Sequence, residues 1–280
     1  MTIVITTRLI FRSDYTLQVR ASVQIKKGST IFISYTPPFF SFLTRRSILE
    51  RGKQFTCECE RCKDPTELGT FLSSVKCQQC EAGLYQPCQG LTDWGCTECQ
   101  HTITHHYFAR IDSNLLTIQT RLDKEDVVQM KTVLAKYQDK LHPNHALLTE
   151  TKQHLAAALG RVDGYRYDQL GREDLQLKIR ISYDLLNICS ILEPGISKSR
   201  GITLLDLTET KARLVLMDSK ENKRVLEELV EIEKELKEAN DILQYEDEDA
   251  LEGNVAKLAR IQLGQLRGHI GGLKNTLLKK

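Results

Sequence analysis

Apolar and polar residues alternate near the amino terminus with the two-residue period of a half-buried β-strand. Residues 16–21 and residues 31–35 both follow this pattern, and residues 26–29 between them have the Lys-Lys-Gly-Ser composition of a turn. The pattern predicts a β-hairpin made of these two strands. Two prolines at 37–38 end the second strand, because proline cannot donate to a strand ladder. Residues 41–51 are expected to form a short helix.

The period becomes helical between about residues 105 and 270. One helix is predicted over 172–192, where it meets the helix-breaking sequence Glu-Pro-Gly at 193–195. Asn144 has the chemistry of an N-cap for an earlier helix. Further helices are predicted over 202–217 and 222–243. Paired antiparallel helices of this length suggest a tetratricopeptide-like array, although no strict 34-residue repeat is present.

The segment from 55 to 100 has little apolar periodicity and contains eight of the nine cysteines, all between residues 57 and 99. A segment this short and rich in glycine needs a bound metal to hold its structure. Together the three patterns predict an α+β protein: a β-hairpin region over 1–54, a small zinc-bound segment over 55–100, and an all-α tetratricopeptide-like domain over 101–280.

Two Cys-x-x-Cys pairs, separated by fifteen residues, have the spacing of a four-cysteine zinc ribbon. They are Cys77/Cys80 and Cys96/Cys99. The alternatives are a redox pair and buried thiols. A redox Cys-x-x-Cys normally opens a helix after a strand, which a turn-rich segment does not provide. We therefore predict zinc at these four cysteines.

A second group, Cys57, Cys59 and Cys62, offers three thiolates where a closed structural zinc site takes four ligands. Cys88, a histidine or a water molecule are the candidates for the fourth position. Metal is predicted at this group as well, with its fourth ligand left open.

Charge excludes some classes of partner. Lysine and arginine total 39 against 37 acidic residues, a net charge of +2, and the segment 77–99 contains neither lysine nor arginine. These values give no support to direct binding of nucleic acid or of a membrane surface. No membrane span or signal peptide is visible, so we expect a cytoplasmic or nuclear protein whose cysteines stay reduced.

Several motifs together resemble one enzyme family. The chain is similar to the SET-and-MYND (SMYD-type) protein-lysine methyltransferases, in the arthropod-like form with an added four-cysteine segment. The resemblance extends over nearly the whole chain from about residue 15. It rests on Gly28-x2-Ile31-x2-Ser34-Tyr35, Thr44-x-Arg46-x2-Leu49, Phe55-x-Cys57-x-Cys59-x2-Cys62, residues 64–70, residues 141–145, and the sequences at 193–195 and 200–201.

This resemblance implies transfer of a methyl group from S-adenosylmethionine to a lysine amine of a histone or another lysine-bearing protein. Tyr35 corresponds to the active-site tyrosine of the family, and Phe55 to the aromatic residue near the adenine. From spacing alone, Tyr35 would be an ordinary half-buried strand residue. The resemblance also implies that 1–54 is a carboxy-terminal part of a SET domain and that 55–100 combines the post-SET motif with the four-cysteine segment.

Some family features have no counterpart in the sequence. Residues 1–27 contain neither the glycine-rich loop nor the Asn-His-x-Cys segment of the family's cofactor pocket, and no MYND finger is present. The cysteine of that segment is the family's fourth ligand for the post-SET zinc. We therefore expect a family member that begins partway through its SET domain and is inactive as this chain. The alternative is a zinc-stabilised interaction module that binds a protein or peptide in a helical-repeat groove.

Overall fold

The computed structural model describes residues 5–80, 82–88, 92–218, 222–247, 249 and 251–278. These residues form two units. The cysteine unit holds residues 34–163, and the helical unit combines residues 5–33 with residues from 164 onward. Helices and small sheets are both present, so the predicted mixed α+β class is confirmed. The predicted boundaries at 54 and 100 stay a prediction.

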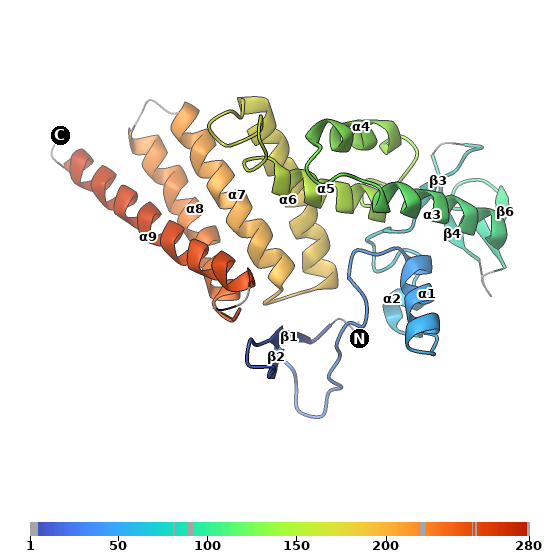
Figure 1. Ribbon diagram of the computed structural model, residues 1–280. Helices are drawn as coiled ribbons and strands as arrows, with labels where there is room; N and C mark the ends of the chain where they lie inside the picture. The colour runs from blue at the N-terminus through green and yellow to red at the C-terminus, as the bar shows by residue number, and fades with distance from the viewer. Residues whose placement is uncertain are drawn as a thin grey trace. The chain divides into compact units, whose positions relative to one another are not determined.

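The cysteine unit is a small antiparallel sheet accompanied by helices (Figure 1). Its strands lie in the order β3-β4-β5-β6, so each strand pairs with its neighbour in sequence. The elements are α1 (Phe42–Gly52), α2 (Glu60–Lys63), β3 (Val75–Lys76), β4 (Leu84–Pro87), β5 (Asp93–Cys96), β6 (Thr102–Thr104), α3 (His105–Thr120), α4 (Val127–Tyr137) and α5 (Ala146–Ala158).

Aromatic side chains of this sheet pack against α3. The ring of Trp94 on β5 stacks on that of Phe108, with 3.4 Å between centroids and 4° between planes. Tyr85 on β4 is fully buried beside them. Their cluster is completed by Phe42, Val75, Cys77, Leu115, Leu141, Leu147 and Leu148. This core supports the loops that carry the cysteines.

The predicted helix over 41–51 is confirmed as α1, with Ser41 as its N-cap accepting from the backbone N–H of Thr44 at 3.3 Å. The N-cap of α5 is His145, whose Nδ1 accepts from Leu147 N–H at 3.1 Å, so the prediction of Asn144 was wrong by one residue. A histidine ring can accept this bond as Asn can.

The described residues of the helical unit form a β-hairpin and four long helices. The hairpin pairs β1 (Thr7–Phe11) with β2 (Leu17–Ala21) in antiparallel register, with Leu9 opposite Val19. Helices adjacent in sequence lie side by side (Figure 1). They are α6 (Arg172–Leu192), α7 (Lys198–Asp218), α8 (Asn222–Leu243) and α9 (Leu251–Leu278). The ranges predicted for α6 and α8 are confirmed, and a tetratricopeptide-like arrangement stays a prediction.

The hairpin differs from the expected one. Residues 31–35 form no strand, and β2 pairs with β1 instead. The segment is held by Phe32, whose backbone oxygen accepts from the N–H of Thr6 at 3.1 Å and from the hydroxyl of Thr7 at 2.9 Å. These bonds fix one point of the segment without forming a ladder. The turn at 26–29 is confirmed, with Gly28 at φ +83°.

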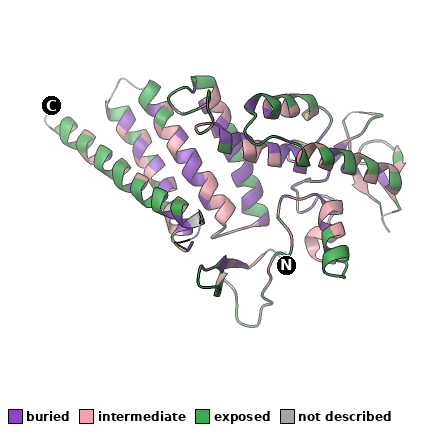
Figure 2. Ribbon diagram, in the orientation of Figure 1, coloured by how far each residue is buried: buried purple, intermediate pink, exposed green. Residues whose placement is uncertain are grey.

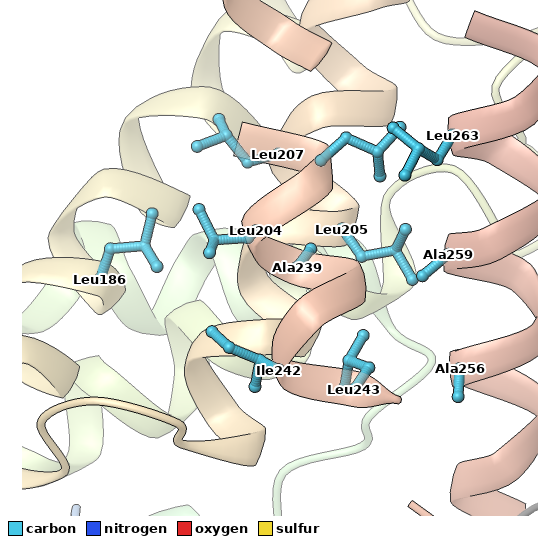
Figure 3. Packing of buried hydrophobic residues seen from close by; sticks show 11 residues of the cluster. Leu186, Leu204, Leu205, Leu207, Ala239, Ile242, Leu243, Ala256, Ala259 and Leu263 are labelled. Carbon is cyan, nitrogen blue, oxygen red and sulfur yellow. The ribbon is translucent and has the colours of Figure 1, made fainter. Parts of the chain in front are cut away.

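The four helices bury a leucine-rich core. Side chains from α6, α7, α8 and α9 gather in one cluster (Figure 3), and much of the surface of α9 away from it is exposed (Figure 2). The members of this hydrophobic cluster are Leu186, Leu204, Leu205, Leu207, Leu236, Ala239, Ile242, Leu243, Ala256, Ala259 and Leu263. None of the helices in the described ranges is long and apolar enough to cross a membrane.

Polar bonds fasten the hairpin to these helices. Arg8 on β1 pairs with Glu246 and donates to the backbone oxygens of Ile196 and Ile242 at 3.1 and 3.0 Å. The N–H of Ile196 donates to the oxygen of Ser22 at 3.1 Å. Because the guanidinium is buried, its carboxylate partner and two carbonyl acceptors offset the cost of removing it from water.

Gly195 makes this attachment possible. It has φ +79°, and a Cβ there would overlap the backbone oxygen of Ser22. Gly195→Ala should therefore raise deuterium exchange in β1 and β2 and lower the unfolding temperature. Gly164 is the control, since its φ of +80° imposes the same backbone strain but nothing lies within 4 Å of its Cβ position. Equal effects of the two substitutions would contradict the close approach.

Candidate metal centres

The four-cysteine ribbon places its thiols together. Cys77 follows β3 and Cys96 ends β5, while Cys80 and Cys99 lie in the turns that follow. Their sulfur atoms all lie within 4.8 Å of one another. The Cys77–Cys99 distance is 3.8 Å and the Cys80–Cys96 distance is 3.6 Å. A tetrahedral zinc with Zn–S bonds of about 2.3 Å requires sulfurs about 3.8 Å apart, so the donor set fits zinc.

Backbone amides point at these sulfur atoms. Gln79 N–H donates to Cys77 at 3.3 Å, Gly83 N–H to Cys80 at 3.4 Å, and Glu98 N–H to Cys96 at 3.4 Å. Such bonds favour the thiolate form and orient metal ligands. Although burial opposes it, backbone N–H groups lower the pKa of Cys77 to about 6. The turns are therefore arranged to hold negative sulfur.

Two residues that the sequence analysis did not identify, Tyr85 and His101, form hydrogen bonds that support the zinc ribbon. The hydroxyl of Tyr85 lies 3.6 Å from the sulfur of Cys77 and 2.8 Å from Nδ1 of His101. Burial, followed by the bond to Cys77, raises the pKa of Tyr85 to about 12, which keeps it neutral and able to donate. A tyrosine on a strand gives no spacing signal, so the sequence offered no means of finding this contact.

Gly83 permits the close packing of the ribbon turns. A Cβ at this position would overlap the sulfur of Cys96 and approach the backbone nitrogen of Glu98 at 3.0 Å. We expect Gly83→Ala to weaken zinc affinity about 10- to 100-fold, the usual effect of disturbing groups around a metal ligand. Competition with a chromophoric chelator measures this. Gly52→Ala, in open space at the end of α1, is the control and should leave affinity unchanged.

The thiols of the second predicted group also lie close together. The sulfurs of Cys57, Cys59 and Cys62 lie within 4.8 Å of one another. Cys59 is the N-cap of α2, and Cys62 N–H donates to its backbone oxygen at 2.9 Å. Hydrogen bonds from Cys62 and Cys57 lower the pKa of the Cys59 thiol to about 5, whereas donation to Cys59 raises the pKa of Cys62. One thiolate is thus already stabilised by the other two thiols.

A buried ion network supports this second cluster. Glu67 accepts from Arg45 at 2.5 Å, from Arg61 at 3.2 Å and from the hydroxyl of Ser73 at 2.6 Å. The other arm of the Arg45 guanidinium lies 3.8 Å from the sulfur of Cys62. Burial, followed by repulsion from Arg45, lowers the pKa of Arg61 to about 10, so it stays charged near neutral pH. Two cations against one carboxylate leave a surplus positive charge beside the thiols.

The charge of Glu67 also reaches other buried groups. Burial opposes its ionisation, but Arg45 and Arg61 outweigh burial and lower its pKa. Burial, with a smaller contribution from the Glu67 carboxylate, raises the pKa of Asp112 to about 6. Burial lowers the pKa of His145 to about 4, against the attraction of Glu67. His145 is therefore neutral around pH 7, as its role as an N-cap acceptor requires.

Removal of this carboxylate should destabilise the cysteine unit. Glu67→Gln leaves two buried guanidiniums without a counter-charge, at a cost of about 3–5 kcal/mol. Urea unfolding followed by the fluorescence of Trp94, the single tryptophan, reports on this unit. Glu50→Gln is the control, because its partly exposed pair with Arg46 at 2.7 Å contributes at most about 1 kcal/mol.

The same network has a defined pH dependence. Because the folded pKa of Glu67 is lowered, its stabilising contribution is fully present above the unfolded value of about 4.3. That contribution is lost as the pH falls through the folded pKa.

A Glu67→Gln protein as stable as the Glu50→Gln control at pH 7 would contradict the role of the network.

The two residues that the resemblance assigns to chemistry lie in contact. The rings of Tyr35 and Phe55 meet edge to face, with centroids 5.8 Å apart and planes at 76°. Both are exposed, at 58% and 40%. Tyr35 lies in a bend, outside any strand. Cys88, considered as a fourth ligand, is exposed and belongs to neither cluster, while Cys189 is fully buried on α6.

Comparison with known proteins gives a consistent set of relatives. The chain is 32% identical over 173 residues to SET domain-containing protein SmydA-8, isoform B, of Drosophila melanogaster, which covers 59% of this chain and 38% of that protein. Isoform A is 33% identical over 165 residues, 56% and 36% of the two chains.

A plant protein, Histone-lysine N-methyltransferase ASHR1 of Arabidopsis thaliana, is 25% identical over 173 residues, 56% of this chain and 36% of that protein. The matched region thus spans less than two fifths of each relative. No protein-family model matches the chain.

Proposed function

We propose, from the premise that this chain belongs to the SMYD-type SET-domain family, that it contributes to S-adenosylmethionine-dependent methylation of lysine in proteins. The name of the plant relative supports a protein substrate, since it specifies histone lysine. Residues 1–54 would belong to the SET domain, 55–100 to the zinc-binding part and 101–280 to the helical part. Nuclear or cytoplasmic placement stays part of this proposal.

The observation that carries the proposal is the contact between Tyr35 and Phe55. These residues are twenty positions apart, yet their rings meet, and both remain open to a ligand. Exposure leaves both rings accessible to a ligand, and the resemblance to the family gives Tyr35 its proposed role. The Cys57, Cys59 and Cys62 cluster follows Phe55 directly in sequence, and a metal there would fix the backbone that presents this ring.

S-adenosylmethionine, when bound, would supply a methyl group activated by its sulfonium centre. The face of Phe55 would offer apolar contact to a flat heterocycle. The hydroxyl of Tyr35 would orient a neutral lysine amine for in-line attack. The two cysteine clusters would hold zinc in structural roles, since their thiolates suit that metal.

We further propose that these 280 residues do not turn over substrate alone. The side chains of Tyr35 and Phe55 are 58% and 40% exposed, so their rings lie open to solvent. An open surface excludes too little water for tight binding of a small molecule. The alternative of a helical-groove interaction module receives no support from the relatives, whose names describe SET-domain proteins and a histone-lysine methyltransferase.

Titration of S-adenosylmethionine into the zinc-loaded chain tests both parts. Calorimetry should give a Kd weaker than about 1 mM, equivalent to less than about 4 kcal/mol of binding free energy. Saturation-transfer NMR at millimolar ligand should still detect adenine contact, and Phe55→Ala should abolish it. Phe11→Ala, which removes a more exposed ring from the hairpin, should not.

Micromolar affinity would overturn the proposed inactivity of the chain. Adenine contact that survives Phe55→Ala would contradict the assignment of the cofactor-side residue.

A further inference from the structure

We infer that the cavity lined by α1, α2 and the zinc ribbon binds a carboxylate carried by a small apolar group. This ligand would be distinct from the proposed methyl donor, and its binding would not depend on methyl transfer. The polar groups on the cavity wall support it, because the acidic groups there are already engaged whereas several donors are not.

The cavity has the size and the lining of a small-molecule site. Its volume is about 660 Å³, and it lies within the cysteine unit. Ligand sites in proteins usually have volumes of about 300–1,000 Å³ and combine apolar walls with a few polar groups. The apolar part of this wall consists of Phe42, Pro65, Pro87 and Trp94. The space is large enough for an aromatic ring with a short polar chain.

Trp94 supplies a buried donor without an acceptor. The residue is 1% exposed, and its ring is held in place by stacking on Phe108. Its indole Nε1–H is buried and donates to no atom of the described residues. Buried polar groups in folded proteins almost always have a partner, either in the protein or in a bound molecule. Because Trp94 lines the cavity, an acceptor atom of a ligand there would satisfy it.

Arg46 and Ser74 add donors to the same wall. The Nε of Arg46 donates to Glu50 at 2.7 Å, while its two terminal nitrogens bond to no described residue. Ser74 is 2% exposed, and its hydroxyl makes no hydrogen bond within the described ranges. A carboxylate has two acceptor oxygens, so it can accept from a guanidinium and from a neutral donor at once.

The acidic groups on the wall already have partners. The carboxylate of Asp64 accepts from two backbone N–H groups, each at 2.8 Å. Glu67 is held by its two arginines and Ser73. Glu58 pairs with Lys63 at 3.4 Å on the exposed side. A cationic ligand would have to displace one of these partners, whereas an anionic ligand meets donors that are unoccupied.

The charge around the cavity also favours an anion. Arg45 and Arg61 together exceed the single charge of Glu67, and Arg46 lies on the wall itself. Thiolate at Cys62 would add negative charge, but the second arm of Arg45 offsets it from 3.8 Å. We therefore expect the carboxylate to contact Arg46 and the indole N–H of Trp94, with the apolar group against the apolar part of the wall.

Nuclear magnetic resonance of the indole N–H tests the inference, because the protein has a single tryptophan. Phenylacetate titrated into zinc-loaded, isotope-labelled protein should move the Nε1 proton of Trp94 downfield in a saturable manner. Phenylacetamide, which has the same ring but no charge, should bind at least about 10-fold more weakly. An unmoved resonance at about 10 mM phenylacetate would overturn the inference, and so would equal binding of the two compounds.

A free organic acid and the carboxyl terminus of a peptide share this chemistry. N-acetylglycylphenylalanine presents a peptide carboxyl terminus with the same ring. Tighter binding of this compound than of phenylacetate would identify a peptide terminus as the ligand, and the reverse order would identify a free acid.

Two variants separate binding from a merely structural role. Arg46→Gln should weaken phenylacetate at least about 10-fold, because a neutral amide replaces the charge. Arg51→Gln, which changes an exposed arginine at the end of the same helix, is the control and should leave affinity unchanged. Ser74→Ala should weaken binding as well, and it keeps the test decisive if Arg46→Gln loses its zinc. Wild-type affinity in a folded Arg46→Gln protein would overturn the inference.

Competition distinguishes this site from that of the methyl donor. S-adenosylmethionine should not displace phenylacetate from the cavity. Displacement would overturn the proposal of a separate ligand, while a chain that binds phenylacetate but no S-adenosylmethionine would contradict only the proposed cofactor contact.

Discussion

The buried carboxylate of Glu67 is the interaction on which the cysteine unit depends. It neutralises guanidiniums from two helices, Arg45 of α1 and Arg61 of α2, and accepts from Ser73. Ser73 in turn accepts from the N–H of Phe42 at 2.6 Å, so the first turn of α1 joins the same network. Because unpaired buried charge is so unfavourable, these segments can adopt only arrangements that keep the carboxylate surrounded.

This constraint extends to the metal chemistry. The network carries a surplus positive charge, and Arg45 directs part of it at the sulfur of Cys62. A zinc bound to thiolates has a net negative charge, so the guanidinium compensates it. The ribbon differs, because its four ligands lie on adjacent turns of one small sheet and its donors are local amides. The ribbon is defined by local sequence, whereas the three-cysteine site depends on contacts with distant residues.

Sequence reasoning succeeded where a period or spacing exists. Helical periodicity predicted α6 and α8, and ligand spacing predicted which cysteines gather. It missed β1, because Thr-Arg-Leu-Ile-Phe at 7–11 does not alternate, and therefore paired β2 with the wrong segment. It also missed Glu67, a single charged residue in a turn where its φ is +53°. The fold brings the partners of such a residue together from separate parts of the chain, so no local sequence pattern predicts them.

The account depends most directly on metal in both cysteine clusters. Native mass spectrometry of the chain, purified without chelator, measures this in one experiment. We predict the mass of the chain with two zinc ions, one for each cluster. A protein that is folded, as judged by the fluorescence of its single tryptophan, yet carries no zinc would contradict the account.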